Sequence, residues 1–167
     1  MIWLSLAHNC LMNDKKVGNL FVFGQFLLIA VLALTPASNL WPATEVLTLI
    51  ANSSFAIGFA LLILSFANLG KSLTANPVPL DKAVLKTSGA YSIVRHPIYL
   101  ALILVAIALT LKTASLVSVI ALLTLVVLLD FKARFEEKLL IKKFANYKNY
   151  AQKVGRLFPG IGRIRQS

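Results

Sequence analysis

Long uncharged apolar runs constrain this chain more than any other feature of its sequence. Gly18 to Thr35 and Val46 to Leu69 carry no charged residue, and Ile98 to Leu129 is interrupted only by Lys112 and a few hydroxyls. A helix that crosses the hydrocarbon core of a bilayer needs about 20 predominantly apolar residues. The chain is 58% hydrophobic and has a mean hydropathy of +0.79, which is far from a soluble globular composition. We therefore predict an all-α integral membrane protein that forms one domain over residues 1–167.

The third apolar run poses a choice between one helix and a hairpin. A single helix from Ile98 to Leu129 would be about 48 Å long, whereas the hydrocarbon core is about 30 Å thick. It would also separate the central loop from residues 131–167, which hold ten Lys or Arg. A turn near Lys112 brings sixteen of the seventeen positive charges to one side. The positive-inside rule then predicts four transmembrane helices, the third and fourth as a hairpin, with both termini cytoplasmic.

The composition limits the partners and the cofactors. Seventeen Lys plus Arg against six acids give a net charge of +11. In a soluble chain this charge would suggest binding to nucleic acid, but in a membrane protein it marks the cytoplasmic side. We therefore expect a multi-pass protein of a bacterial inner membrane or the endoplasmic reticulum. The expected partner is the lipid bilayer, and no nucleic acid is expected. The lone Cys10, with His8 and His96, favours neither an internal disulfide nor an ordinary zinc site. The sequence leaves the oligomeric state open.

The two end segments have different characters. Residues 1–17 mix apolar and polar residues, a pattern that fits either a short interfacial helix or a segment without ordered structure. The same residues lack the pattern of a cleaved signal peptide, so we expect Met1 to be the start of the mature protein. Phe131 to Val154 alternates apolar residues with Lys and Arg. This pattern predicts a basic amphipathic helix that continues the fourth span and lies on the membrane or over the central loop.

A polar loop, Gly70 to Arg95, precedes the third apolar run and ends in a basic stretch from Lys86 to Tyr99. Loops of this length are usually functional or disordered. Gly89 permits a backbone conformation closed to other residues, and Pro97 favours the first turn of a helix. Arg95, His96 and free backbone N–H groups would then lie at a helix N-terminus, where a carboxylate or phosphate binds well. A positively charged loop that only anchors a membrane helix fits the same residues.

The acidic pair Glu136-Glu137 stands among many cations. The two carboxylates can form pairs with neighbouring basic residues on the same helix, or they can bind a ligand. The sequence leaves both interpretations open.

Two blocks of sequence together resemble a known family. G-A-Y-S-I-V-R-H-P-I-Y-L runs from Gly89 to Leu100, and R-F-E-E-K-L-L-I-K-K-F-A-N-Y-K-N-Y with R-L-F-P spans Arg134 to Pro159. These blocks resemble the isoprenylcysteine carboxyl methyltransferase and phospholipid methyltransferase group of membrane enzymes, over about residues 76–163. The chain departs from the family pattern at Ala90, Ser92 and Ala101, and Ser92 removes a positive charge near the expected site.

The resemblance implies a site for S-adenosyl-L-methionine formed by the central loop, the start of the third span and the helix after the fourth. By its place in the family motif, Glu136 would bind the cofactor through a hydrogen bond to the ribose or to the amino group of the cofactor. The substrate-orienting, catalytic arginine of the family falls near Lys132 or Arg134, and we prefer Arg134. The expected cofactor-binding residues are Val84, Leu85, Lys86, Gly89, Tyr91, Arg95, His96, Pro97, Tyr99, Glu136 and Glu137, and no metal is expected.

The chemistry of these residue types agrees with that cofactor. A sulfonium favours an aromatic face or a carboxylate, and the amino-acid carboxylate of the cofactor favours cationic donors such as Arg95 with His96. The expected function is methyl transfer to a lipophilic acceptor within the membrane, most simply a carboxylate, which needs no general base. N-methylation of a phospholipid, N- or S-methylation of another small molecule, and a non-catalytic membrane subunit that binds anionic lipid remain alternatives.

Overall fold

The structure is a computed structural model that describes residues 2–72, 74–80 and 82–164, and within these ranges it is helical without any strand. The helices are α1 (Ile2–Leu34), α2 (Glu45–Leu69), α3 (Pro97–Thr113), α4 (Leu116–Lys143) and α5 (Tyr147–Lys153), with the short 3₁₀ turns η1 (Gly70–Ser72) and η2 (Gly89–Ser92).

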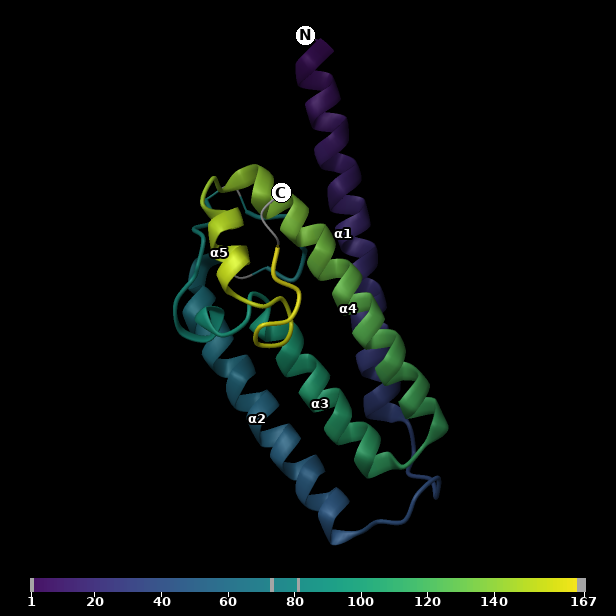
Figure 1. Cartoon of the computed structure of the whole chain (residues 1–167). Helices are drawn as coiled ribbons and strands as arrows, with labels where there is room; N and C mark the ends of the chain where they lie inside the picture. Colours follow the sequence, from purple (N-terminus) through teal and green to yellow (C-terminus); the bar gives the residue numbers. More distant parts are fainter. Residues whose placement is uncertain (1, 73, 81, 165–167) are drawn as a thin grey trace.

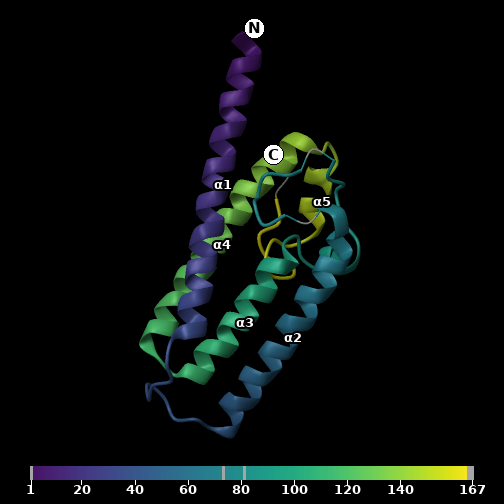
Figure 2. The same ribbon diagram turned by 180° about the vertical axis from the view of Figure 1, so that it is seen from behind.

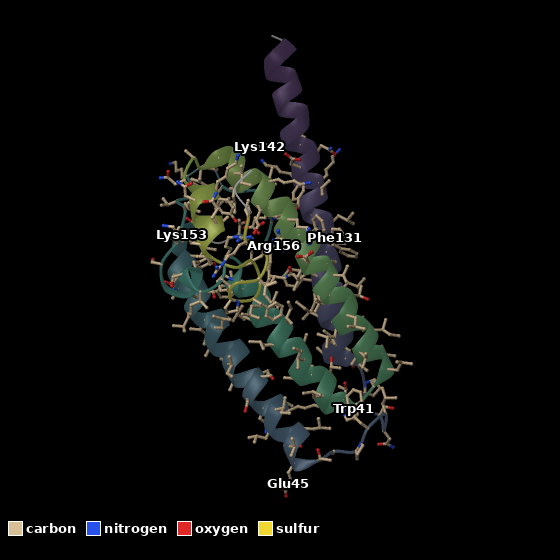
Figure 3. The ribbon with its side chains drawn as sticks, viewed as in Figure 1. Trp41, Glu45, Phe131, Lys142, Lys153 and Arg156 are labelled. Atoms are coloured by element: carbon tan, nitrogen blue, oxygen red, sulfur yellow. The ribbon has the colours of Figure 1, made fainter. Side chains whose placement is uncertain are left out.

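The four long helices run up and down beside one another (Figure 1). α3 lies between α2 and the pair formed by α1 and α4, and the view from behind shows the same order (Figure 2). The central loop, α5 and the C-terminal segment gather at one end of the bundle, beyond which the first turns of α1 project. Figure 3 places Lys142 and Lys153 at this end and Trp41 and Glu45 at the opposite one.

Three helices are long and apolar enough to cross a membrane: Met12–Leu34 of α1, Glu45–Leu69 and Leu116–Lys143. The prediction of an all-α membrane protein is therefore confirmed. α3 is a shorter apolar helix of 17 residues, about 26 Å long at about 1.5 Å per residue. It forms the predicted hairpin with α4, since the chain turns at Ala114, which adopts a left-handed conformation with φ 45°.

The helix ends follow the local sequence. Pro97 is the first residue of α3, as predicted, because a proline there loses no intrahelical hydrogen bond. Thr44 caps α2 through its hydroxyl, which accepts from the Leu47 N–H at 3.2 Å. Gly89 has φ +63° and lies so close to the Asn68 side chain that any Cβ would collide with it. The expected special backbone conformation at Gly89 is confirmed.

Two expectations for the end segments are wrong. Residues 2–17 are neither a separate interfacial helix nor irregular, because α1 is continuous from Ile2 to Leu34; the segment before Gly18 contains no glycine or proline that would break it. Phe131 to Val154 is not one helix either. α4 ends at Lys143, Phe144 is extended, and α5 starts again at Tyr147. This reversal lets α5 fold back onto the residues that precede α3.

Close approach of α2 and α3 depends on small residues. A Cβ at Gly58 would lie 3.0 Å from the Ala101 carbonyl oxygen, and Ala101 and Ala51 are fully buried. Small residues at helix contacts are typical of membrane bundles, where van der Waals packing replaces the hydrophobic effect. The core between the other helices is formed by larger side chains, among them Ile103 and Leu125.

Candidate functional site

Two neighbouring cavities open at the end of the bundle that carries the central loop. The first, which we call the helix cavity, has a volume of about 450 Å³ and is bounded by α1, α2, α3 and α4. The second, the loop cavity, has about 90 Å³ and lies under the central loop against α4 and α5. Both are lined by Leu69, Thr74, Tyr91, Arg95 and Glu136. These five residues therefore form a junction between the space among the helices and the space under the loop.

Glu136 holds two of the predicted site residues together at this junction. The Tyr99 hydroxyl donates to Glu136 Oε2 at 2.7 Å, and His96 Nδ1 lies 3.6 Å from the same oxygen. The rings of His96 and Tyr99 stack with centroids 5.1 Å apart. Glu136 itself keeps 27% of its side chain exposed, so one face of its carboxylate remains open to a ligand.

Glu137 has the opposite environment, since its side chain is only 5% exposed. It is ion-paired with Arg95 at 2.6 Å and with Arg156 at 3.0 Å, and His96 Nε2 lies 3.3 Å from it. A buried carboxylate is stable only with such partners. Of the two interpretations of the acidic pair, structural pairing therefore describes Glu137, although its partners differ from the neighbours on α4 that we expected.

Arg95 uses all of its donors within the protein. Besides Glu137, its guanidinium donates to the carbonyl oxygens of Ala151, Val154 and Gly162. Five N–H groups are all that an arginine offers. The backbone N–H groups of these two residues are also engaged: Arg95 N–H donates to Gly155 O at 2.9 Å, and His96 N–H donates to Arg156 O at 3.1 Å. The Arg95 guanidinium and these two N–H groups are therefore not open donors for an anion, because Glu137 and the C-terminal residues occupy them.

Lys132 points into the helix cavity and is almost completely buried, with 1% exposure. Its Nζ donates to Gln25 Oε1 at 2.7 Å and lies 5.0 Å from the centroid of the Tyr99 ring. Within the part of the chain that the structure describes, Lys132 has no ion-pair partner within 4.0 Å. A buried ammonium without a counterion is costly, so this position favours an anionic ligand.

Arg134, the arginine preferred from the motif, lies outside both cavities. Its side chain is 56% exposed and its Nε donates to Asp130 at 2.7 Å. Two positions along a helix differ by about 200° in direction, so Lys132 and Arg134 face opposite sides of α4. Between the two candidates for the substrate-orienting residue, the geometry favours Lys132.

Three tyrosines line the loop cavity. Burial, together with the Glu136 carboxylate and Tyr150, raises the pKa of Tyr91. Burial also raises the pKa of Tyr147, and it raises the pKa of Tyr150 to about 12 against the opposing effect of Arg95. All three phenols therefore stay protonated near neutral pH. The Tyr150 hydroxyl donates to the Tyr91 carbonyl, whereas the buried Tyr147 hydroxyl has no hydrogen-bond partner among the described residues.

The other predicted residues divide into three groups. Val84, Leu85 and Lys86 line the loop cavity. Gly89 and Pro97 line neither cavity as described, and they shape the backbone before and at the start of α3. Glu137 lines a groove on the outer face of α4 instead.

Three residues of the site were missed in the sequence. Gln25 lies in α1, outside the resembling blocks, and only its polarity within an apolar run could have indicated it. Tyr147 and Arg156 lie within the sequence blocks that resemble the family, but their spacing in the sequence does not predict what their side chains contact. In the described part of the chain, no group of three or more His, Cys, Asp or Glu side chains is arranged to hold a metal ion.

Comparison with known proteins assigns the chain to a family. Among curated proteins, none matches it. The model of the phospholipid methyltransferase family matches residues 46–147, which include α2, the central loop, α3, α4 and the first residue of α5. This family belongs to the group of membrane methyltransferases that the two sequence blocks resemble, so that prediction is confirmed. Because the match covers more than half of the chain, this protein belongs to the phospholipid methyltransferase family and is a membrane methyltransferase.

Proposed function

We propose that the protein transfers a methyl group from S-adenosyl-L-methionine to a lipophilic acceptor that carries an anionic group. The observation that carries the proposal is the junction at Tyr91 and Glu136, where the larger cavity among the helices meets the smaller cavity under the central loop. A lipophilic acceptor suits the first space, whose walls include Phe26, Leu62 and Leu102, and the cofactor suits the second, where Lys86, Tyr91 and Glu136 supply polar groups. The two reactants would then meet at residues common to both.

The residues of the loop cavity fit the cofactor. The cofactor, when bound, supplies an electrophilic methyl group on a sulfonium sulfur. Tyr91 and Glu136 offer an aromatic ring and a carboxylate for that cation. Val84 and Leu85 offer apolar contact for the adenine ring, and the unpartnered Tyr147 hydroxyl offers a buried hydrogen bond. In this proposal Arg95, saturated by the protein, positions the loop and His96 rather than binding the cofactor itself.

Binding requires the loop to move. The loop cavity of about 90 Å³ is smaller than the roughly 300 to 1,000 Å³ of most small-molecule pockets. The contacts that hold the first part of the loop against the bundle include the Asn76 amide, which donates to Asn19 Oδ1 at 2.7 Å, and Lys143, which donates to the Leu80 carbonyl. We expect these contacts to open and re-form around the cofactor.

Lys132 would orient the acceptor. Its ammonium lies at the polar end of a cavity whose walls include Phe26, Ile29, Leu62 and Leu102, so a hydrocarbon tail and an anionic head can be bound together. A carboxylate is already a nucleophile and needs no general base. Alignment of the reactants in a dry cavity then supplies most of the rate advantage, and His96 acts as a binding residue.

A second candidate acceptor is the amine of a phospholipid. Glu136 carries a negative charge one helical turn from Lys132, so a zwitterionic head group could place its phosphate near Lys132 and its amine near Glu136. The family name supports the same acceptor.

We also propose that α3 crosses the membrane as the third of four spans, with both termini cytoplasmic. Its shorter length is offset by local thinning of the bilayer or by tilt of its neighbours. Reporter fusions after Asn39 and after Lys112 should be non-cytoplasmic, and fusions at Lys82 and Ser167 cytoplasmic. A cytoplasmic reporter at Lys112 would contradict the four-span arrangement.

Methyl-labelled cofactor tests the function. Purified protein should bind S-adenosyl-L-methionine. Tyr147→Phe should weaken this binding about two- to tenfold without lowering the stability of the cofactor-free protein, because the Tyr147 hydroxyl has no hydrogen-bond partner among the described residues. Membranes that contain the protein should transfer label to the lipid fraction. Mild alkali releases labelled methanol from a methyl ester and leaves an N-methyl group intact, so it separates the two acceptors. Failure to bind the cofactor would favour a non-catalytic subunit.

A further inference from the structure

A third hollow lies on the outer face of α4, away from both cavities. This outer groove has a volume of about 920 Å³ and runs between α1 and α4. Phe21, Val127 and Phe131 line its apolar part, and Arg134, Lys138 and Arg156 line its charged part. Figure 3 labels Phe131 on α4 and Arg156 in the C-terminal segment. The groove is not needed for the reaction proposed above, and it accounts for Arg134, which the reaction does not use.

The charged part of the groove has a surplus of positive charge. Arg134 pairs with Asp130 only through Nε, so no described residue is bonded to its two terminal nitrogens. Arg156 shares Asp130 at 3.2 Å, and its other carboxylate partner, Glu137, is already paired with Arg95. Lys138 is exposed and has no ion pair within the described residues. Four cations, Arg95, Arg134, Lys138 and Arg156, thus stand against two carboxylates, Asp130 and Glu137, in this cluster.

The order of residues along the groove matches the order of groups in a membrane lipid. Val127, Phe131, Arg134 and Lys138 are spaced four, three and four residues apart, so they form one stripe on α4. α4 is uncharged from Leu116 to Leu129, and its charges start at Asp130. The stripe thus passes from the apolar part of the span to the level of the head groups, and Val127 and Phe131 are 55% and 60% exposed at its apolar end.

We propose that the outer groove binds one anionic phospholipid of the surrounding bilayer. Arg134 and Lys138 would hold its phosphate, Arg134 through the two-pronged geometry that its free terminal nitrogens allow. The upper part of an acyl chain would lie along Phe131, Val127 and Phe21. A free phosphate in solution would use only half of this surface, which is why the occupant is a lipid. The site is separate from the acceptor position at Lys132, which faces the other side of α4.

Native mass spectrometry of the purified full chain tests the proposal with lipids of identical acyl chains. Phosphatidylglycerol should be retained by the wild-type protein in preference to phosphatidylcholine. The double variant Arg134→Ala/Lys138→Ala should lose about tenfold or more in affinity for phosphatidylglycerol, since each basic residue near an anionic lipid contributes about 1 kcal/mol. The variant Lys142→Ala/Lys148→Ala removes the same charge from exposed positions outside the groove and should lose less than about twofold.

Two further arms identify the occupant. Phe131→Ala should weaken retention of both lipids severalfold, because it removes apolar contact from the groove. Millimolar inorganic phosphate should not displace the lipid. Equal losses in the two double variants would mean general attraction to a basic surface, and displacement by phosphate would mean an anion site without lipid selectivity; either result would overturn the proposal.

Discussion

The inner and outer faces of α4 carry charged residues that are close in sequence but differ in their environments. Lys132 and Glu136, one turn apart, face the cavities. Lys132 is buried and has no ion-pair partner among the described residues, whereas Glu136 keeps part of its side chain exposed. Arg134 and Lys138, also one turn apart, face the outer groove and are exposed. Glu137 lies between the two faces and is saturated by partners. Direction around the helix axis, rather than residue type, thus separates cavity-facing, buried and exposed charges on α4.

The largest effect is expected at the residue between the two faces. Glu137→Gln leaves Arg95 and Arg156 without their shared carboxylate, and breaking a buried ion pair costs about 3 to 5 kcal/mol. We expect the thermal midpoint of the detergent-purified protein to fall sharply. Asp130→Asn is the matched control, because its ion pairs are partly exposed and such pairs contribute less than about 1 kcal/mol. Equal stability of the two variants would show that Glu137 does not hold the site together.

The inner face is tested next by Lys132→Met. Methionine keeps an unbranched side chain of similar size and removes the charge, so turnover should fall about 10- to 150-fold, as expected for loss of a hydrogen bond to a charged acceptor. Stability should be unchanged or higher, because an apolar side chain replaces a buried ammonium. Measured kcat and KM, together with the thermal midpoint, check both statements. Full activity in this variant would return the substrate-orienting role to Arg134.

Glu136→Gln should have a smaller effect on the same face. The variant keeps the shape of the side chain and loses its charge, so affinity for S-adenosyl-L-methionine should fall about tenfold. The Tyr99 hydroxyl can still donate to the amide oxygen, so the fold should persist. Equilibrium binding with labelled cofactor measures the change, and wild-type affinity would assign Glu136 a structural role alone.

The smallest effect is expected on the outer face. Arg134→Ala should lower turnover no more than about two- to threefold, since the exposed pair with Asp130 contributes at most about 1 kcal/mol. A hundredfold loss of turnover in Arg134→Ala, with unchanged affinity for the cofactor, would show that the outer face of α4 also takes part in the reaction.

The sequence was a good guide to the spans and a poor guide to the direction of side chains. Uncharged runs, Pro36, Gly70 and Pro97 predict where α1 and α2 end and where α3 starts, because length and backbone chemistry are local properties. The side of α4 that faces the cavity could not be predicted. In a membrane both the lipid-facing and the protein-facing sides of a helix are apolar, so α4 lacks the polar stripe that fixes the orientation of a helix in a soluble protein.

The site itself could be predicted only in part for a related reason. Local motifs indicated that His96, Tyr99 and Glu136 belong together, and the structure brings them into contact. The carbonyl partners of Arg95 lie more than 50 residues away, at Ala151, Val154 and Gly162. No spacing rule links an arginine to carbonyl oxygens at that separation, because every residue has one.

The contact between Arg95 and Gly162 has a consequence for truncation of the chain. Residues 155–162 lie outside the four-helix bundle, yet they supply carbonyl oxygens to the Arg95 guanidinium and to the backbone N–H groups of Arg95 and His96. A variant cut before Gly155 keeps α1 to α4 and all of the long apolar segments, so we expect it to insert in the bilayer. The same variant leaves Arg95 and His96 without these partners, so insertion and an ordered candidate site become separable properties.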